Sequence, residues 1–204
     1  MLVETGSARL LFDPGTFSHG FEELTDLDAI LITHQHFDHL DVDRLPALVE
    51  ANPQATLVVD PGSAEEEIAK LALAATVAQV GDTIELTGAV VHAVGGNHAV
   101  IHPEYPVPPN IGYVVDGGAF YHPGDSHFVP EQKIDVLGLP AAAPWMKTGE
   151  SAEFMRAVGP RIAVPIHDAT LSEVGKQGTI AWFTRLAREE TEVRALTQLE
   201  PVEM

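Results

Sequence analysis

The sequence of 204 residues contains no cysteine. Disulfide bonds and thiolate metal sites are therefore excluded, and any metal ion must be held by imidazole or carboxylate groups. No apolar run reaches the length of about 18 residues that a membrane span needs, and no basic segment followed by a long apolar stretch opens the chain. We therefore predict a soluble cytoplasmic protein that does not act at a membrane.

Basic residues are scarce as well. Eleven Lys and Arg stand against 30 Asp and Glu, which gives a formal net charge of −19 at pH 7. A chain with this charge repels polyanions over long range, so we expect a small-molecule substrate and no nucleic acid partner. A solvated surface that favours solubility explains most of the acidity.

The composition is that of a globular protein, with 45% apolar and 20% charged residues. No internal repeat, low-complexity tract or long linker interrupts the sequence. A chain of this length can bury a core without cross-links, so we predict one domain over residues 1–204.

Short apolar runs that end in polar residues alternate with segments of helical spacing. The predicted strands are Leu10–Phe12, Ala29–Ile32, Thr56–Val59, Ala89–Val94, Ile111–Val115, Ala119–Tyr121, Val136–Leu139 and Ile162–Ile166. The predicted helices are Asp41–Glu50, Ser63–Ala75, Ala152–Val158 and Leu171–Glu190. This alternation favours a layered α/β sandwich, although the pattern alone allows one sheet or two.

Two local signals refine these elements. Ser63, followed three residues later by Glu66, has the spacing of a capping box at a helix start. The sequence Asp116-Gly117-Gly118 is typical of a hairpin turn between two strands.

A dense group of metal-binding side chains follows the strand predicted at residues 29–32. Residues 33–39 are Thr-His-Gln-His-Phe-Asp-His. His34, His36 and Asp38 alternate along an extended segment and can share one direction, while His39 turns elsewhere, which suits two neighbouring ions. The alternatives are a histidine-rich surface loop and a single structural metal site, but closed zinc sites without cysteine are less common.

Further ligands are needed, because a binuclear site uses about six to eight protein donors. His98, Asp125 and His167 are the candidates, since each follows an apolar strand. His92 and His102 compete with His98, which is favoured because a Gly-Gly-Asn loop precedes it.

Taken together, these motifs resemble the metallo-β-lactamase fold superfamily, and within it the metal-dependent hydrolases similar to the ascorbate-6-phosphate lactonase and acyl-ethanolamide phospholipase D branches. The resemblance extends over almost the whole chain. It rests on Phe12–Gly15, Thr33–His39, Gly124-Asp125 and Pro165–Asp168. It implies a four-layer αββα sandwich with the metal ions at one edge.

The resemblance also implies a ligand set. One ion is held by His34, His36 and His98, the other by Asp38, His39 and His167, and Asp125 bridges the pair. Two divalent ions are expected, with zinc favoured and manganese or iron suited to the same donors. Asp13 resembles the carboxylate that supports a ligand from behind, although an ordinary Asp-Pro-Gly turn explains it equally well.

The implied reaction is hydrolysis by a hydroxide that bridges the two ions, with Asp38 and Asp125 as catalytic residues. Lactones, phosphoesters and thioesters are the candidate substrates. Tyr105, Trp145 and Lys147 lie in segments suited to pocket walls, where ordinary loop packing also explains them. The alternatives are a metal- or metabolite-binding module without turnover and a ribonuclease of the same superfamily, for which no RNA-binding surface is evident.

Similar family members usually begin with one more strand, often bearing a Gly-His pair, before the strand that corresponds to Leu2–Thr5. That opening is absent here, which indicates either an upstream start or a sheet without this edge strand. The difference affects the pocket and not the metal cluster. An exposed edge at this point also favours pairing between subunits, so we expect a homo-oligomer.

Overall fold

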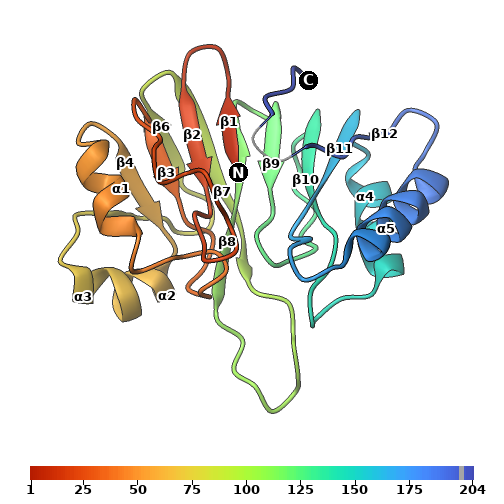
Figure 1. The fold of residues 1–204 in the computed structure, drawn as a ribbon, viewed down its shortest axis with the longest axis horizontal. Helices are drawn as coiled ribbons and strands as arrows, with labels where there is room; N and C mark the ends of the chain where they lie inside the picture. Colours follow the sequence, from red (N-terminus) through yellow and green to blue (C-terminus); the bar gives the residue numbers. More distant parts are fainter. Residues whose placement is uncertain (198–199) are drawn as a thin grey trace.

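Two β-sheets lie face to face between two groups of helices, as the computed structural model of residues 1–197 and 200–204 shows (Figure 1). Helices α1, α2 and α3 lie on one outer side, and α4 and α5 lie on the other. The predicted four-layer αββα sandwich is therefore confirmed, and the choice between one sheet and two, which the pattern left open, is decided.

The first sheet has five strands in the order β1-β2-β3-β4-β5. They are β1 (Leu2–Glu4), β2 (Arg9–Phe12), β3 (Ala29–Leu31), β4 (Thr56–Val59) and β5 (Thr76–Val77). β1 is antiparallel to β2, and the remaining pairs are parallel. The carboxyl ends of β2, β3 and β4 therefore meet at one edge of the sheet.

The second sheet has seven strands in the order β12-β11-β10-β9-β8-β7-β6. They are β6 (Thr83–Leu86), β7 (Ala89–Asn97), β8 (Pro109–Val115), β9 (Phe120–His122), β10 (Val136–Pro140), β11 (Ile162–Ile166) and β12 (Glu192–Val193). β9 to β12 are parallel, whereas β6 to β9 form an antiparallel meander. The loop between β7 and β8 projects far from the sheets (Figure 1).

The main core fills the space between the sheets. Leu10 and Phe12 of β2 face the second sheet there, whereas Leu11 faces the helices on the outside. This alternation follows from the two-residue period of a strand and explains why strands buried on both faces are continuous apolar runs. A further apolar cluster lies between the first sheet and its helices, and another lies between the second sheet and its helices.

The helices that cover the first sheet are α1 (Leu45–Ala51) and a continuous segment made of α2 (Pro61–Ser63), a π-helical turn (Ala64–Ile68) and α3 (Ala69–Leu71). α4 (Thr148–Val158) and α5 (Glu173–Leu186) cover the second sheet. Within residues 1–197 and 200–204, none of the helices combines the length and hydropathy that a bilayer-spanning segment requires.

The capping box predicted at Ser63 is wrong. Asp60 is the N-cap, and its carboxylate accepts hydrogen bonds from the backbone N–H groups of Gly62 and Ser63, at 2.8 and 3.2 Å. Pro61 takes the first helical position, where a missing N–H has no cost, so the helix starts two residues earlier. It ends at Leu71 and not Ala75, because Ala72 adopts a left-handed φ of 53°.

Other boundaries differ for similar local reasons. The helix predicted from Asp41 begins at Leu45, because the Asp41 carboxylate accepts from the Arg44 N–H at 2.9 Å and forms a separate turn. β7 continues through the predicted Gly-Gly-Asn loop to Asn97, paired with Pro109. β5, β6 and β12 were not predicted, although the Thr-Ile-Glu-Leu of β6 alternates as an exposed strand does. The predicted hairpin turn is confirmed, with positive φ at Asp116 and Gly117.

Candidate metal centre

Side chains from both sheets meet at the edge where the parallel strands end. His34, His36, Asp38 and His39 lie in the loop after β3, and His98, Asp125 and His167 follow β7, β9 and β11. His167 has a left-handed φ of 56°, as does Asp13 at the end of β2, with 46°. Such a conformation costs a non-glycine residue about 1–2 kcal/mol. It also occurs at Asp26, Ala72 and Asp116 outside the cluster, so here it explains how His167 and Asp13 are directed and does not by itself mark the site.

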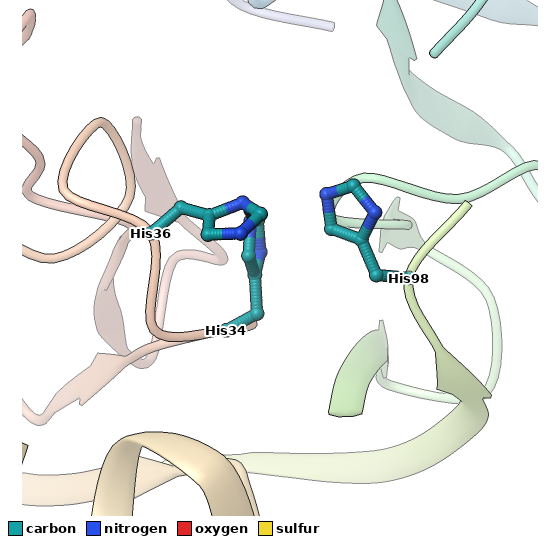
Figure 2. A group of neighbouring side chains, drawn as sticks. All are labelled: His34, His36 and His98. Carbon is teal, nitrogen blue, oxygen red and sulfur yellow. Dashed lines mark hydrogen bonds between the residues drawn. The ribbon is translucent and has the colours of Figure 1, made fainter. Parts of the chain in front are cut away.

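The ligand atoms converge in three groups, each with all members within 4.8 Å of one another. The groups are His34, His36 and His98; His34, His39 and Asp125; and Asp38, His39 and His167. Figure 2 shows the rings of His34 and His36, from one loop, facing the ring of His98 from the opposite side. The seven residues that the sequence singled out are thus neighbours in space.

Asp125 lies between the two predicted halves of the cluster. Its Oδ2 is 3.4 Å from His98 Nε2, and its Oδ1 is 3.2 Å from His39 Nε2 and 3.5 Å from His167 Nε2. His167 Nε2 is in turn 3.2 Å from Asp38 Oδ2. In tetrahedral coordination with bonds of 2.0–2.1 Å, two ligand atoms are about 3.3 Å apart, so these distances match the edges of metal polyhedra.

Hydrogen bonds fix three of the histidines in the tautomer that a metal needs. The Nδ1 atoms of His39, His98 and His167 lie 2.7 Å from Asp13 Oδ2, 2.5 Å from Ala99 O and 2.6 Å from Ala142 O. An acceptor at each Nδ1 leaves the proton there and directs the Nε2 lone pair into the cluster.

Buried polar atoms without hydrogen-bond partners also indicate that the cluster fits divalent metal ions. Within the described part of the chain, only seven buried side-chain nitrogen and oxygen atoms lack a hydrogen-bond partner, and four of them are His39 Nε2, His98 Nε2, His167 Nε2 and Asp125 Oδ1. Buried polar atoms without a partner cost about 1–3 kcal/mol each, so their concentration at one point indicates a bound ion.

The electrostatics of the cluster favour the metal-binding forms of most groups. Burial, with repulsion from His39, lowers the pKa of His34 well below its ordinary value, so the ring is neutral. Burial alone would raise the pKa of Asp125, but the attraction of His39 holds it well below its ordinary range. Burial opposes a charge on His39 too, yet Asp125 and Asp13 raise its pKa, so a metal must displace this proton.

Two glycines let the loops approach closely enough. A Cβ on Gly15 would lie 1.8 Å from the backbone oxygen of Asp38, and a Cβ on Gly124 would lie 2.2 Å from Asn110 Oδ1. Gly124 also has a φ of +61°, which favours glycine. The Asp-Pro-Gly and Gly-Asp motifs therefore bring Asp13 and Asp125 up to the histidine loop.

Asp13 supports His39 from behind. Its Oδ2 accepts from His39 Nδ1 and from Thr33 Oγ1, both at 2.7 Å, and its Oδ1 accepts from the Thr33 N–H at 2.8 Å. The buried carboxylate is thus hydrogen-bonded at both oxygens and holds the His39 ring in place.

We expect Asp13→Asn to weaken metal binding by about 10- to 100-fold, because an amide cannot accept from His39 as strongly and leaves Nδ1 without a charged partner. Competition with a chromophoric chelator measures this affinity. Asp26→Asn is the matched control, since Asp26 is an exposed aspartate with the same left-handed backbone, φ 58°. Equal affinity in the two variants would contradict a supporting role for Asp13.

The competing histidines lie elsewhere. His92 Nδ1 is 3.1 Å from Thr83 Oγ1 on the strand pair β6–β7, and exposed His102 accepts from the N–H of Glu104. His122 was not among the predicted site residues, but it is buried, stacks on Phe12 and has Nδ1 3.9 Å from Asp13 Oδ2. The signal available in the sequence was its place directly after the predicted strand Ala119–Tyr121, although in the structure it is the last residue of β9.

The three predicted substrate contacts separate into two kinds. Tyr105 and Trp145 line a cavity beside the cluster. Trp145 also donates from Nε1 to Asp125 Oδ2 at 2.7 Å, a contact that no local pattern in the sequence indicates. The structure does not bring Lys147 to the cavity, because its 86% exposed side chain pairs with Glu150 at 3.3 Å at the start of α4.

The chain is similar to a known protein family and to several relatives. The Beta-lactamase superfamily domain matches residues 1–167. Protein Rv0786c of Mycobacterium tuberculosis is 54% identical over 176 residues, which cover 84% of this chain and 81% of that protein. UPF0173 protein PF0020 of Pyrococcus furiosus is 30% identical over 84% of this chain and 80% of its own length. A UPF0173 metal-dependent hydrolase of Pyrococcus abyssi is 26% identical over 98% and 93%.

Solved structures share the fold. A protein of Parabacteroides distasonis, provisionally assigned as a metal-dependent hydrolase, has a TM-score of 0.70 and 25% identity over 92% of this chain and 84% of its own. The metallo-β-lactamase fold protein YhfI of Bacillus subtilis has a TM-score of 0.70 at 17% identity, over 97% and 87%. With its histidine and aspartate cluster, the chain therefore belongs to the beta-lactamase superfamily and is a metal-dependent hydrolase of the metallo-β-lactamase type.

Proposed function

We propose that this hydrolase uses two divalent ions to cleave one bond of a small ester, lactone, phosphoester or thioester with water. Zinc suits the nitrogen and oxygen donors, and manganese or iron suits them as well. Two such ions would supply an acidified water and would polarise the oxygen of the bond under attack.

The proposal rests on the position of the Asp125 carboxylate, whose two oxygens lie beside different histidines. Oδ2 lies beside His98, whereas Oδ1 lies beside His39 and His167. A single carboxylate in this position favours two neighbouring ions over one. Its hydrogen bond from Trp145, at 2.7 Å, fixes the plane of the carboxylate and so the direction of both oxygens.

Asp38 is the group we propose to handle protons. It lines the cavity, and its side chain is half-buried beside His167. Burial alone would raise the pKa of Asp38, but the hydrogen bond with His167 and the attraction of His39 lower it, so the carboxylate starts in the basic form. From the cavity wall it can orient the attacking water and pass a proton to the leaving group.

We expect His36→Ala to lose bound metal and to reduce turnover by on the order of 100-fold or more, since one ligand of the His34–His36–His98 group disappears. Metal analysis by mass spectrometry, followed by a screen of lactones, phosphodiesters and thioesters, measures both effects. His92→Ala is the matched control, because His92 lies outside the cluster beside Thr83.

The screen also separates this proposal from a binding module without turnover. Two ions per chain and hydrolysis that depends on His36 support the proposal. Two ions without any His36-dependent turnover would favour the binding module, and one ion per chain in the active protein would contradict the binuclear arrangement.

A further inference from the structure

A cavity of about 680 Å³ opens beside the metal centre, within the range of small-molecule sites. His36, Asp38, His98, Asp125 and His167 form its polar side. The remaining walls are almost entirely apolar or aromatic and include Phe17, Phe37, Ile101, Tyr105, Pro144 and Trp145. The cavity therefore offers a reactive polar side and a large apolar surface next to it.

The walls carry no cation. None of the 11 Lys and Arg residues, all of which lie in the described part of the chain, lines the cavity. Lys147 pairs with Glu150, and Lys176 pairs with Asp168. Arg44 pairs with Asp41 and Glu22. An anionic group on a substrate would lose its hydration in these walls without gaining a charged partner.

Polar donors are scarce in the walls too. The indole N–H of Trp145, a natural donor to a ligand, is already bound to Asp125 Oδ2 at 2.7 Å. Outside the ligand cluster, the hydroxyl groups of Tyr105 and Thr170 are the main neutral polar groups at the lining. The walls therefore recognise surface area and shape more than hydrogen-bonding groups.

Three large aromatic side chains of the lining are unusually exposed. Phe37 is 62% exposed, Tyr105 56% and Phe17 43%. The rings of Phe37 and Phe17 meet edge to face, with their centroids 5.5 Å apart. One exposed aromatic ring is ordinary, but three around one cavity form a patch that a ligand would cover. Covering such rings is strongly favourable, because each buries a large apolar area.

We infer that the site takes a neutral ester, lactone or thioester with an apolar acyl part and disfavours substrates with an additional anionic group. This inference rests on the hydrolytic function proposed above. Water adds its oxygen to the acyl carbon, the bond from that carbon to the leaving oxygen or sulfur breaks, and a proton passes to the leaving atom.

The charge preference is tested with two esters of equal length. 4-Nitrophenyl hexanoate and the 4-nitrophenyl monoester of adipic acid differ only in a terminal methyl or carboxylate group. We expect kcat/KM of the metal-loaded protein to be at least tenfold higher for the hexanoate. It should also rise from acetate to hexanoate by up to roughly fourfold for each methylene that the walls bury. Equal efficiency for hexanoate and adipate monoester would overturn the inference.

A variant pair localises the effect. Tyr105→Lys places an ammonium group in the wall, away from the ligands, and should reduce the hexanoate preference at least tenfold. Val174→Lys adds the same charge on α5 at an 80% exposed position outside the cavity and should leave the preference unchanged. Equal metal content in both variants shows that the centre is intact. Equal effects of the two variants would contradict the assignment of this cavity.

A binding measurement separates failure of this inference from failure of the hydrolytic function. Hexanohydroxamate and adipic monohydroxamate are titrated into metal-loaded Trp182→Phe, in which Trp145 is the remaining tryptophan and reports on the cavity. Binding of hexanohydroxamate that is tenfold or more tighter supports the preference for a neutral ligand. If no ester or phosphodiester is hydrolysed at the same time, the proposed hydrolytic function is overturned and the preference is not. Equal binding would overturn the preference.

Discussion

Replacement of Asp125 by asparagine should reduce kcat/KM by on the order of a thousandfold and lower the metal content of the protein. The amide keeps the size of the side chain but loses its charge, and it presents an oxygen to only one of the two histidine groups that Asp125 contacts. A bound metal contributes several kcal/mol to catalysis, and each 1.4 kcal/mol is about tenfold in rate. Steady-state kinetics and metal analysis on the same preparation measure both losses.

Asp116→Asn is the control for this change. Asp116 is an exposed aspartate in the turn between β8 and β9, and its φ of 46° suits asparagine. It should keep full activity and full metal content. If Asp125→Asn retained two ions and more than a tenth of the activity, Asp125 could not be the bridging ligand.

Removal of the metal should lower the melting temperature of the protein by about 8–16 °C. The candidate ligands come from the loop after β3 of the first sheet and from the ends of β7, β9 and β11 of the second, so metal bound by them would join the two sheets. An ion at a free concentration of about 1,000 times its Kd stabilises a fold by about 4 kcal/mol, and each kcal/mol shifts Tm by about 2–4 °C in a domain of this size. Calorimetry with and without a chelator measures the shift.

Readdition of zinc should restore the original Tm, and the His36→Ala protein should respond to the chelator far less than the wild type. A chelator that shifted the two proteins equally would act somewhere other than the cluster. A wild-type Tm that did not change would show that the sheets pack without help from the ions.

The elements that the sequence predicted well are those with strong local patterns. β2, β4 and β11 agree with the predicted runs to within a residue, because strands buried on both faces are bounded by polar residues. β5 and β12 were missed because each has two residues and is held by a neighbouring strand, not by its own pattern. The single domain over residues 1–204 and the homo-oligomer stay predictions, as does the branch within the superfamily.

By itself, the sequence determined the chemistry of the ligands. The absence of cysteine left imidazole and carboxylate donors, and the spacing of His34, His36, Asp38 and His39 in one loop needed no knowledge of the rest of the chain. Such information is local, because alternation along an extended segment decides which side chains can share a direction.

Only the tertiary structure decided the features that depend on residues far apart in the chain. It brought His98 to the cluster and left His92 and His102 outside, and it turned the Trp145 N–H toward Asp125. It also assembled an apolar cavity from loops of both sheets and left Lys147 in solvent. The pairing and packing of strands set these positions, and the local spacing of residues does not show which strand ends will meet.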